Sequence, residues 1–259
     1  MLEIASAQQS PFKRLGLDSF SSISKFFLRE SLPQKTAAIV RRGEIPLADG
    51  SSHEVFYKQY EFASPAWKFL CRPSKALCEW RNYGVFVRLG IPCPEPIACG
   101  EERDPLGRLR RAFIITRAIP ESETLIQFWQ KPSPQAARKK LLLQLADLAR
   151  CIHEAGFFHH DLVWRNILVS AQTPGEPQLW WIDCPRGSFD SWSPLRQRKK
   201  LKDLASLDKS AVKFCTRRER LAFLKAYLGR KRLDAEVKSL ARAVVDYRHT
   251  RWPEDWEGV

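Results

Sequence analysis

Residues 133–183 constrain the fold of this chain more than any other segment, because they set a long helix, a polar loop and an aspartate-ended strand in a fixed order. Ser133 is predicted to cap the helix, with Pro134 in its first turn and an end near Gly156. The apolar side chains of this helix recur at spacings of four, three and four residues, which predicts a single stripe formed by Leu141, Leu145, Leu148 and Ile152.

The loop after this helix reads FHHDLVWRNILV, Phe158–Val169, and places Asp161 and Asn166 five positions apart in an apolar frame. After the turn-rich TPGEPQ, the run QLWWIDC predicts a short strand that carries Asp183 at its end. Three interpretations are open at this point: a metal site, a buried strand with stray polar residues, or the chemical centre of an enzyme.

The metal-site interpretation is the weakest of the three. His153, His159 and His160 are separated by six positions and one position, which does not place three ligands on one helix face. The seven cysteines contain no C-x-x-C pair, and this pattern predicts reduced, structural thiols rather than a zinc or disulfide framework.

The first half of the chain predicts the order strand, strand, helix, strand, strand. TAAIVRR and EVFYKQYEF are separated by the turn-rich GEIPLADGSSH and predict an antiparallel pair. A helix opens at Pro73 and Ser74 and ends at Gly90. IPCPEPIACGEE and LRRAFIITRAI predict two further strands around a turn at residues 104–107. The pattern is typical of an α+β protein with an antiparallel sheet.

A composition change at PESETLIQFWQKPSP predicts a division into two lobes. We expect an N-terminal extension over residues 1–35, an N-lobe over 36–120 and a C-lobe over 121–259, the last mainly helical and basic from Leu195 onward. Within the extension, LDSFSSISKFFLRE predicts a short amphipathic helix. We expect this helix to pack on the body of the protein, the alternative being an element of a membrane surface.

The order of these elements matches the arrangement that protein-kinase-like enzymes use for phosphoryl transfer, whose loop reads H-R-D-L-x-x-x-N. His159, Asp161, Leu162 and Asn166 match this pattern, and His160 takes the place of the arginine. The carboxylate of Asp161 can orient an attacking hydroxyl and accept its proton. Because the phosphates of ATP also need a cation, Lys58 is predicted to contact them and Glu79 to hold Lys58 through an ion pair. Hard oxygen ligands for Mg²⁺ would come from Asn166 and Asp183.

Four segments of the chain resemble the bacterial lipopolysaccharide kinase (Kdo/WaaP) family: KALCEWRNYGVFVRLGIPCPEPIACGEE, HHDLVWRNILV, WIDCPRG and RRERLAFLKAYLG. The resemblance covers about residues 36–250. It implies a bilobal protein-kinase-like fold, with an antiparallel β-sheet and one helix in the N-lobe and a mainly helical C-lobe. It also implies ATP- and Mg²⁺-dependent phosphorylation of a heptose or Kdo hydroxyl of the lipopolysaccharide inner core, at the cytoplasmic face of the inner membrane.

The resemblance assigns further roles. Asp161 would be the catalytic base, Asn166 and Asp183 the metal ligands, and Lys58 with Glu79 the pair that positions the phosphates. Arg186 and Gly187 match the D-x-x-R-G ending of the family. Asp203 resembles the buried aspartate that braces the catalytic loop in kinase folds, and His159 is expected to be a second buried brace.

Two departures from protein kinases leave alternatives open. Only Gly43 and Gly50 lie in the segment before Lys58, so the chain has no G-x-G-x-x-G loop to cover the phosphates. DCPRG replaces D-F-G and no A-P-E segment follows, which disfavours a peptide substrate. The alternatives are a small-molecule kinase of the aminoglycoside or choline type and a non-catalytic, membrane-associated stress protein with a kinase-like fold.

The charge balance indicates an anionic partner, since 43 Lys and Arg face 29 Asp and Glu for a net charge of +14. The clusters RQRKKLK, TRRER and GRKRL are either solvated helix faces or a surface that docks the glycolipid substrate on an anionic inner membrane, and the excess of positive charge disfavours a cationic substrate. Nucleic acid is disfavoured because no recognised binding motif accompanies the charge. The sequence lacks a run of ~20 apolar residues, so we expect a cytoplasmic, peripherally bound protein, and no oligomeric state is predicted.

Overall fold

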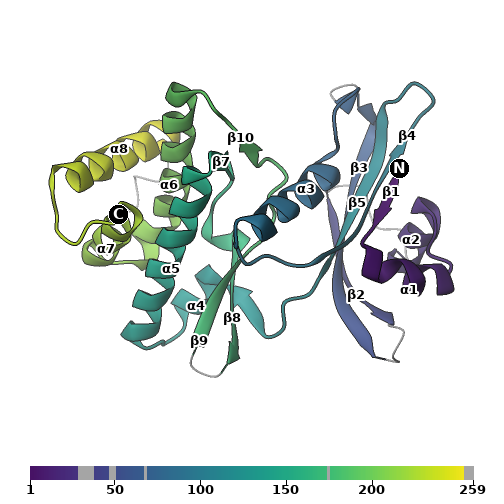
Figure 1. The fold of residues 1–259 in the computed structure, drawn as a ribbon, viewed down its shortest axis with the longest axis horizontal. Coiled ribbons are helices and arrows are strands. Elements are labelled where there is room, and N and C mark those ends of the chain that lie inside the picture. Colours follow the sequence, from purple (N-terminus) through teal and green to yellow (C-terminus); the bar gives the residue numbers. More distant parts are fainter. Residues whose placement is uncertain (29–37, 47–50, 67–68, 174–175, 254–259) are drawn as a thin grey trace. The chain divides into compact units, whose positions relative to one another are not determined.

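The computed structural model describes residues 1–28, 38–46, 51–66, 69–173 and 176–253, and the chain divides into two compact units (Figure 1). The first unit comprises residues 1–85 and 94–119, and the second comprises residues 86–93 and 120–259. The expected boundary between residues 35 and 36 lies outside the described residues. The described part of the expected extension, residues 1–28, belongs to the first unit, and residues 86–93 belong to the second although they were expected in the N-lobe.

The first unit is built on a five-stranded antiparallel sheet whose strands lie in the order β1-β4-β5-β3-β2. The strands are β1 (Leu2–Ile4), β2 (Ile39–Pro46), β3 (Ser52–Ala66), β4 (Pro96–Arg103) and β5 (Leu109–Arg117). The predicted strand pairs are therefore present, and β1 adds an edge strand that sequence patterns did not indicate. The turn between β4 and β5 is held by Asp104, whose carboxylate accepts hydrogen bonds from the backbone N–H groups of Leu106 and Arg108.

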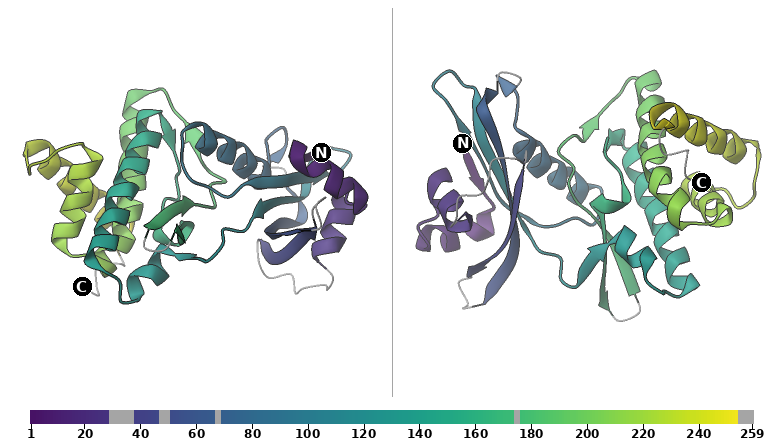
Figure 2. Two further views of the ribbon diagram at one scale, coloured as in Figure 1. Left: turned by 60° about the horizontal axis from the view of Figure 1, so that its bottom comes forward. Right: turned by 180° about the vertical axis from the view of Figure 1, so that it is seen from behind.

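Two N-terminal helices, α1 (Gln9–Arg14) and α2 (Phe20–Phe27), follow the 3-10 turn at Ser6–Gln8 and pack on one face of this sheet (Figures 1 and 2). Ile23 is fully buried, and the ring of Phe27 stacks on that of Tyr57 with centroids 4.8 Å apart. A capping box between Ser19 and Ser22 starts α2. The prediction that this amphipathic helix packs on the body of the protein is confirmed.

The helix α3 (Lys75–Arg88) begins as predicted, because the hydroxyl of Ser74 accepts a hydrogen bond from the backbone N–H of Leu77. The backbone N–H of Ser74 in turn donates to Glu101 on β4 at 2.6 Å. Burial acts to raise the pKa of Glu101, but the hydrogen bonds from Ser74 and from Arg103 outweigh it and lower that pKa. An ionised carboxylate therefore anchors the start of α3 to the sheet.

The second unit is mainly helical, with two small antiparallel sheets (Figure 2). Its helices are α4 (Leu125–Gln130), α5 (Gln135–Glu154), α6 (Ser193–Phe214), α7 (Arg217–Tyr227) and α8 (Ala235–Arg251). One sheet has the order β6-β8-β9, with β6 (Ser122–Thr124), β8 (Ile167–Thr173) and β9 (Glu176–Trp181), and the other pairs β7 (Phe157–Phe158) with β10 (Ser188–Phe189). Helix α5 packs against α7, and α6 packs against α8.

The start of α5 differs from the prediction in its cap. Pro134 occupies the N-cap position and Ser133 does not cap the helix, since its hydroxyl accepts a hydrogen bond from Arg138 instead. A serine one position too early cannot reach the free N–H groups of the first turn. Leu141, Leu145 and Ile152 are buried as predicted, but Leu148 is only half-buried and the neighbouring Leu142 is buried in addition.

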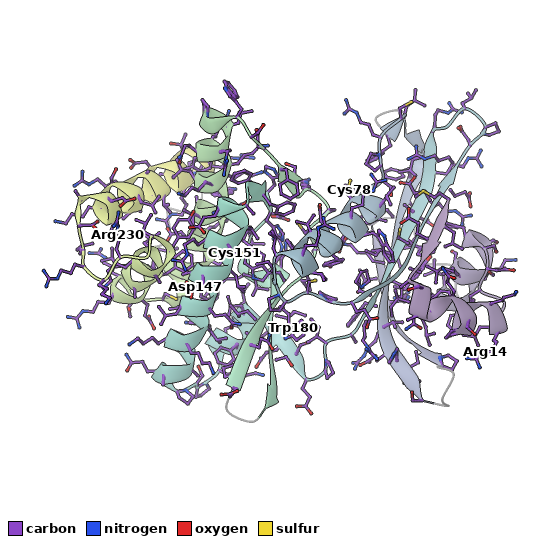
Figure 3. All side chains as sticks on the ribbon, viewed as in Figure 1. Arg14, Cys78, Asp147, Cys151, Trp180 and Arg230 are labelled. Atoms are coloured by element: carbon purple, nitrogen blue, oxygen red, sulfur yellow. The ribbon has the colours of Figure 1, made fainter. Side chains whose placement is uncertain are left out.

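None of the seven cysteines, all of which lie within the described residues, forms a disulfide. Figure 3 shows Cys78 on α3 and Cys151 on α5. Burial raises the pKa of Cys93 and of Cys99 to about 12, so these thiols stay protonated and are poor nucleophiles. In the described part of the chain, no helix combines the length and the apolar character that crossing a membrane requires.

Candidate active site

In the first unit, the predicted ion pair between Lys58 and Glu79 is present. Strand β3 carries Lys58 and α3 carries Glu79, and the Lys58 Nζ lies 3.1 Å from a carboxylate oxygen of Glu79. The Glu79 side chain is only 4% exposed and accepts further hydrogen bonds from the hydroxyls of Tyr83 at 3.0 Å and Tyr60 at 3.4 Å. Two phenol donors and one ammonium group thus fix the carboxylate, and the carboxylate fixes the ammonium.

The face of the sheet that carries Lys58 also carries exposed apolar side chains. Along β3, Val55 and Tyr57 point into the core, whereas Phe56 is 39% exposed on the opposite face. Val40 on β2 lies directly opposite Lys58 in the register and is 53% exposed. An apolar platform therefore lies beside a positioned cation, an arrangement suited to a ligand with a flat ring and phosphate groups.

In the second unit, Asp203 on α6 holds the polar loop that follows β7. Its two carboxylate oxygens accept hydrogen bonds from the backbone N–H groups of His159 and His160, each at 2.8 Å. Burial acts to raise the pKa of Asp203, but its contacts with His153 and His159 outweigh burial and lower that pKa. The completely buried carboxylate is therefore ionised and paired, and it fixes the backbone of the loop from below.

His159 was expected to brace the loop, and it does so by packing. Its ring is fully buried between those of Phe86 and Trp181, with centroids about 6 Å away in each case. Neither ring nitrogen has a hydrogen-bond partner among the described residues, and burial lowers the pKa of His159. A neutral imidazole in an apolar box is the result, so the hydrogen bonding at this residue comes from its backbone.

His160 has a structural role in the loop, but the sequence did not indicate its partner. Its backbone has a φ of 65°, and its Nε2 lies 2.9 Å from the hydroxyl of Ser188 on β10. This contact ties the loop to the segment that follows Asp183. Burial lowers the pKa of His160 to about 4, so the ring is neutral near pH 7. The one signal for this role in the sequence was that histidine stands where kinase loops have arginine.

Asp161 and Asn166 lie close together in the loop. The Nδ2 of Asn166 donates to the backbone oxygen of Asp161 at 3.0 Å, and Arg165 lies 3.6 Å from the Asp161 carboxylate. Asn166 is 4% exposed, whereas the Asp161 side chain is 38% exposed. The loop therefore buries the amide and presents the carboxylate to solvent. Its apolar frame is buried as predicted, at Phe158, Leu162, Ile167 and Val169.

Strand pairing brings Asp183 next to Asn166. Ile167 on β8 lies opposite Trp181 on β9, and the backbone N–H of Ile182 donates to the backbone oxygen of Asn166 at 3.0 Å. Asp183 is the next residue and has a φ of 57°, which turns the chain away from the sheet. Three predicted site residues are thus gathered in one unit.

The donor atoms of these residues fit Mg²⁺. Because the Asn166 nitrogen is engaged with Asp161, its amide oxygen is the atom left to face a cation, and Asp183 supplies a carboxylate. Among the described residues no group of three or more His, Cys, Asp or Glu side chains could hold a metal ion by itself. Two hard oxygen ligands from protein, completed by phosphates and water, are a usual arrangement for Mg²⁺.

Comparison with known proteins identifies the family. A sequence model of the lipopolysaccharide kinase (Kdo/WaaP) family matches residues 59–227, which is more than half of the chain. The chain belongs to the lipopolysaccharide kinase (Kdo/WaaP) family. The matched segment contains Glu79, the polar loop and Asp203, and it begins one residue after Lys58.

Two relatives are 3-deoxy-D-manno-octulosonic acid kinases of Haemophilus influenzae. That of strain 86-028NP is 33% identical over 122 residues, and that of strain ATCC 51907 / DSM 11121 / KW20 / Rd is 30% identical over 122 residues. Each match covers 46% of this chain and 49% of the relative, so the chain spans about half the length of the curated relatives it matches.

A solved structure of WaaP in complex with acyl carrier protein has a similar fold. The match has a TM-score of 0.72 and covers 99% of this chain and all of that one, at 22% sequence identity. The predicted α+β, bilobal protein-kinase-like fold is therefore confirmed.

One residue that the family resemblance singled out has no supporting contact. Arg186, in the D-x-x-R-G ending, is exposed, and its side chain makes no hydrogen bond or ion pair with any described residue.

The segment in which kinase-like enzymes have a glycine-rich loop is only partly described, because residues 47–50 lie outside the described part of the chain. Gly43 on β2 makes room for a neighbouring side chain, because a Cβ at this position would lie 2.9 Å from the ring of Phe27.

Proposed function

We propose that the protein transfers the γ-phosphoryl group of ATP to a sugar hydroxyl, of heptose or Kdo, in the lipopolysaccharide inner core. The observation that carries the proposal is the pairing of two preorganised sites in one chain of this family. One is the Lys58–Glu79 ion pair, and the other is the loop of Asp161 and Asn166 held by Asp203. Phosphoryl transfer needs mainly positioning and charge neutralisation, which is what fixed groups of this kind supply.

The first unit is assigned to the nucleotide. The ammonium group of Lys58, held by Glu79, neutralises charge on the phosphates of ATP. The exposed side chains of Val40 and Phe56 contact the adenine ring on the same face of the sheet. Aromatic and branched apolar side chains can bury a purine ring without a glycine-rich loop.

The second unit is assigned to the transfer step. Asp161 accepts the proton of the attacking sugar hydroxyl, and its exposed carboxylate is accessible for this. Asn166 orients Asp161 through its hydrogen bond to the backbone, and with Asp183 it would hold Mg²⁺. When bound, Mg²⁺ would supply charge neutralisation between the phosphates of ATP. Asp203 acts through the backbone of the loop and is a positioning residue.

The sugar acceptor is assigned from the relatives and the charge of the chain. Its relatives are named as kinases of 3-deoxy-D-manno-octulosonic acid, and this sugar is the acceptor we favour. The net charge of +14 suits an anionic glycolipid on an anionic inner-membrane surface, where each nearby Lys or Arg contributes ~1 kcal/mol.

Peripheral binding to such a membrane surface gives a separate prediction. We expect the protein to cosediment with anionic vesicles at low salt and to remain in the supernatant at high salt. Cosedimentation that is equally strong at low and high salt would contradict electrostatic binding.

The proposal is tested with purified protein, ATP, Mg²⁺ and unphosphorylated core glycolipid. We expect ADP formation that depends on the glycolipid, and we expect Asp161→Asn to lower kcat by at least about a hundredfold while nucleotide binding persists. Asp246→Asn is the matched control, because Asp246 is exposed on α8 and lies outside the proposed site.

Each alternative function gives a different result. A non-catalytic kinase-like protein would bind nucleotide without glycolipid-dependent ADP formation in the wild type. A small-molecule kinase would form ADP with a free amino alcohol and not with the glycolipid. Equal turnover by Asp161→Asn and the wild type would overturn the role of Asp161.

A further inference from the structure

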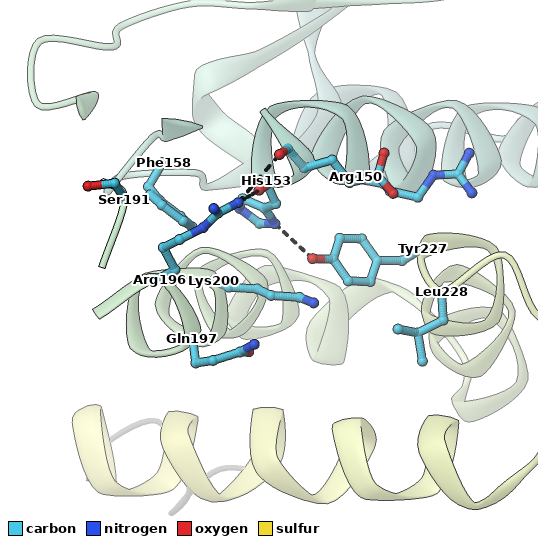
Figure 4. Close-up of a pocket in the computed structure, with 10 residues that line it drawn as sticks. Arg150, His153, Phe158, Ser191, Arg196, Gln197, Lys200, Tyr227 and Leu228 are labelled. Carbon is cyan, nitrogen blue, oxygen red and sulfur yellow. Dashed lines mark hydrogen bonds between the residues drawn. The ribbon is translucent and has the colours of Figure 1, made fainter. Parts of the chain in front are cut away.

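A cavity of about 420 Å³ lies between α5, α6 and α7 of the second unit, and of the residues named in the candidate active site only His153 and Phe158 line it (Figure 4). It is large enough for a ligand the size of a small metabolite. Three of its lining residues are cations and one is a carboxylate. Its titratable lining residues are Arg150, His153, Glu154, Arg196, Lys200 and Tyr227.

Lys200 places a half-buried ammonium group in the wall of this cavity. Its side chain is half-buried, and its ammonium group lies over the ring of Tyr227, 5.2 Å from the centroid. It makes no ion pair and no hydrogen bond with any described residue. Burial lowers the pKa of Lys200, against the opposing effect of the carboxylates of Glu236 and Glu154. A partly desolvated cation without a counterion is costly, and an anion in the cavity would offset that cost.

Arg196 presents a second cation in a fixed position. One of its terminal nitrogens donates to the backbone oxygens of His153 and Glu154, at 3.3 and 3.4 Å, at the end of α5. Its Nε and its other terminal nitrogen have no acceptor among the described residues. Because guanidinium presents its N–H groups in a rigid fork, the remaining donors are preorganised for an oxyanion.

The floor of the cavity is connected to the polar loop. In Figure 4 the hydroxyl of Tyr227 points to His153, and it lies 2.9 Å from the Nδ1 of that ring. The Nε2 of His153 lies 3.4 Å from Asp203, the same carboxylate that holds the loop. Two side chains, those of Tyr227 and His153, therefore connect a ligand in this cavity to Asp203, the residue that positions Asp161.

We propose that this cavity binds a phosphate group, with Lys200 and Arg196 as its ligands and with room for an attached group of monosaccharide size. Arg150 also lines the cavity, but it is already paired with Asp147 at 2.9 Å and adds positive charge without serving as a ligand. Phosphate is favoured because its three oxygens accept from a guanidinium fork and a point cation together.

The test is calorimetric titration of the full chain, at constant ionic strength, with inorganic phosphate, glucose 1-phosphate and glucose. We expect saturable binding of both phosphate probes and none of glucose. Lys200→Met should weaken that binding by at least about tenfold, since it removes a charged hydrogen-bond donor and keeps the length of the side chain. Arg196→Gln should act in the same direction, and circular dichroism checks that both variants are folded.

Two controls locate the site. Arg198→Gln removes the same charge from an exposed position two residues from Lys200 on α6, and it should change binding by less than about twofold. Lys58→Met alters the proposed nucleotide site and should leave phosphate binding intact.

The titrations also distinguish a phosphorylated sugar from free phosphate as the ligand, and they show whether the cavity binds phosphate at all. Tighter binding of glucose 1-phosphate than of inorganic phosphate supports a phosphorylated sugar as ligand, and equal binding supports the free anion. The proposal is overturned if neither probe binds the wild type, if glucose binds as well as glucose 1-phosphate, or if Lys200→Met and Arg196→Gln both bind like the wild type.

Discussion

At the scale of single residues, Asp203 fixes the polar loop of the second unit. It is completely buried and satisfies two backbone N–H groups of the loop as well as His153. Removing its charge leaves those donors facing a neutral group in an apolar environment, where unsatisfied polar groups are expensive. The position of Asp161 thus depends on a residue that has no exposed surface.

We expect Asp203→Asn to lower the free energy of unfolding by about 2 kcal/mol or more, because one amide oxygen replaces two carboxylate oxygens as acceptors. Urea denaturation followed by circular dichroism measures this loss. Asp246→Asn, an exposed change, should stay within about 0.5 kcal/mol of the wild type. A loss of stability no greater in Asp203→Asn than in this control would contradict the assignment.

The histidines of the loop predict a dependence of stability on pH. Burial lowers the pKa of His160 from 6.5 to about 4 and also lowers that of His159, so the unfolded chain binds more protons in this interval. The contribution of His160 to stability is therefore complete above pH 6.5 and is lost as the pH falls toward about 4, and His159 acts in the same direction. Asn tolerates the positive φ of residue 160, and we expect His160→Asn to flatten the decline.

Urea titrations across that pH interval measure the slope for both proteins. A slope identical in His160→Asn and in the wild type would show that this ring does not titrate with folding.

At the scale of elements, α2 and β2 fit together because position 43 has no side chain. A Cβ at Gly43 would lie 2.9 Å from the ring of Phe27, which cannot move freely because it stacks on Tyr57. We expect Gly43→Ala to lower the free energy of unfolding by about 1–3 kcal/mol through this overlap. The double variant Gly43→Ala, Phe27→Ala tests the cause, because the cost of the alanine should shrink once the ring is gone. Equal costs in both backgrounds would place the effect of Gly43 elsewhere.

The same scale shows what the sequence could predict about the elements. Alternation along β3 and helical spacing in α3 were enough to place Lys58 and Glu79 on elements that could pair, because local periodicity decides which face a side chain occupies. The contact of His160 with Ser188 depends on the pairing of two strands of two residues each, which leave no periodic signal. The α5 cap was mispredicted because Ser133 lies one position before the N-cap, where its hydroxyl accepts a hydrogen bond from Arg138 instead.

At the scale of the whole molecule, order along the chain was more informative than any single motif. The fold was predictable because strands, helices and the aspartate-ended strand follow one another as in the kinase-like arrangement, and this order survives the absence of a glycine-rich loop. The packing of the N-terminal helices on the sheet and the cavity around Lys200 were not predictable in residue detail. Both depend on contacts between segments far apart in the sequence, which periodicity does not encode.

The central claim is that this chain moves a phosphoryl group from ATP to a sugar of the inner core. The most direct measurement is mass spectrometry of unphosphorylated core glycolipid after incubation with the protein, ATP and Mg²⁺. We predict that one phosphate is added to one heptose or Kdo residue, and that the product is missing when Asp161→Asn replaces the wild type. Recovery of the glycolipid unchanged from the wild-type reaction, under conditions in which the protein binds ATP, would contradict the claim.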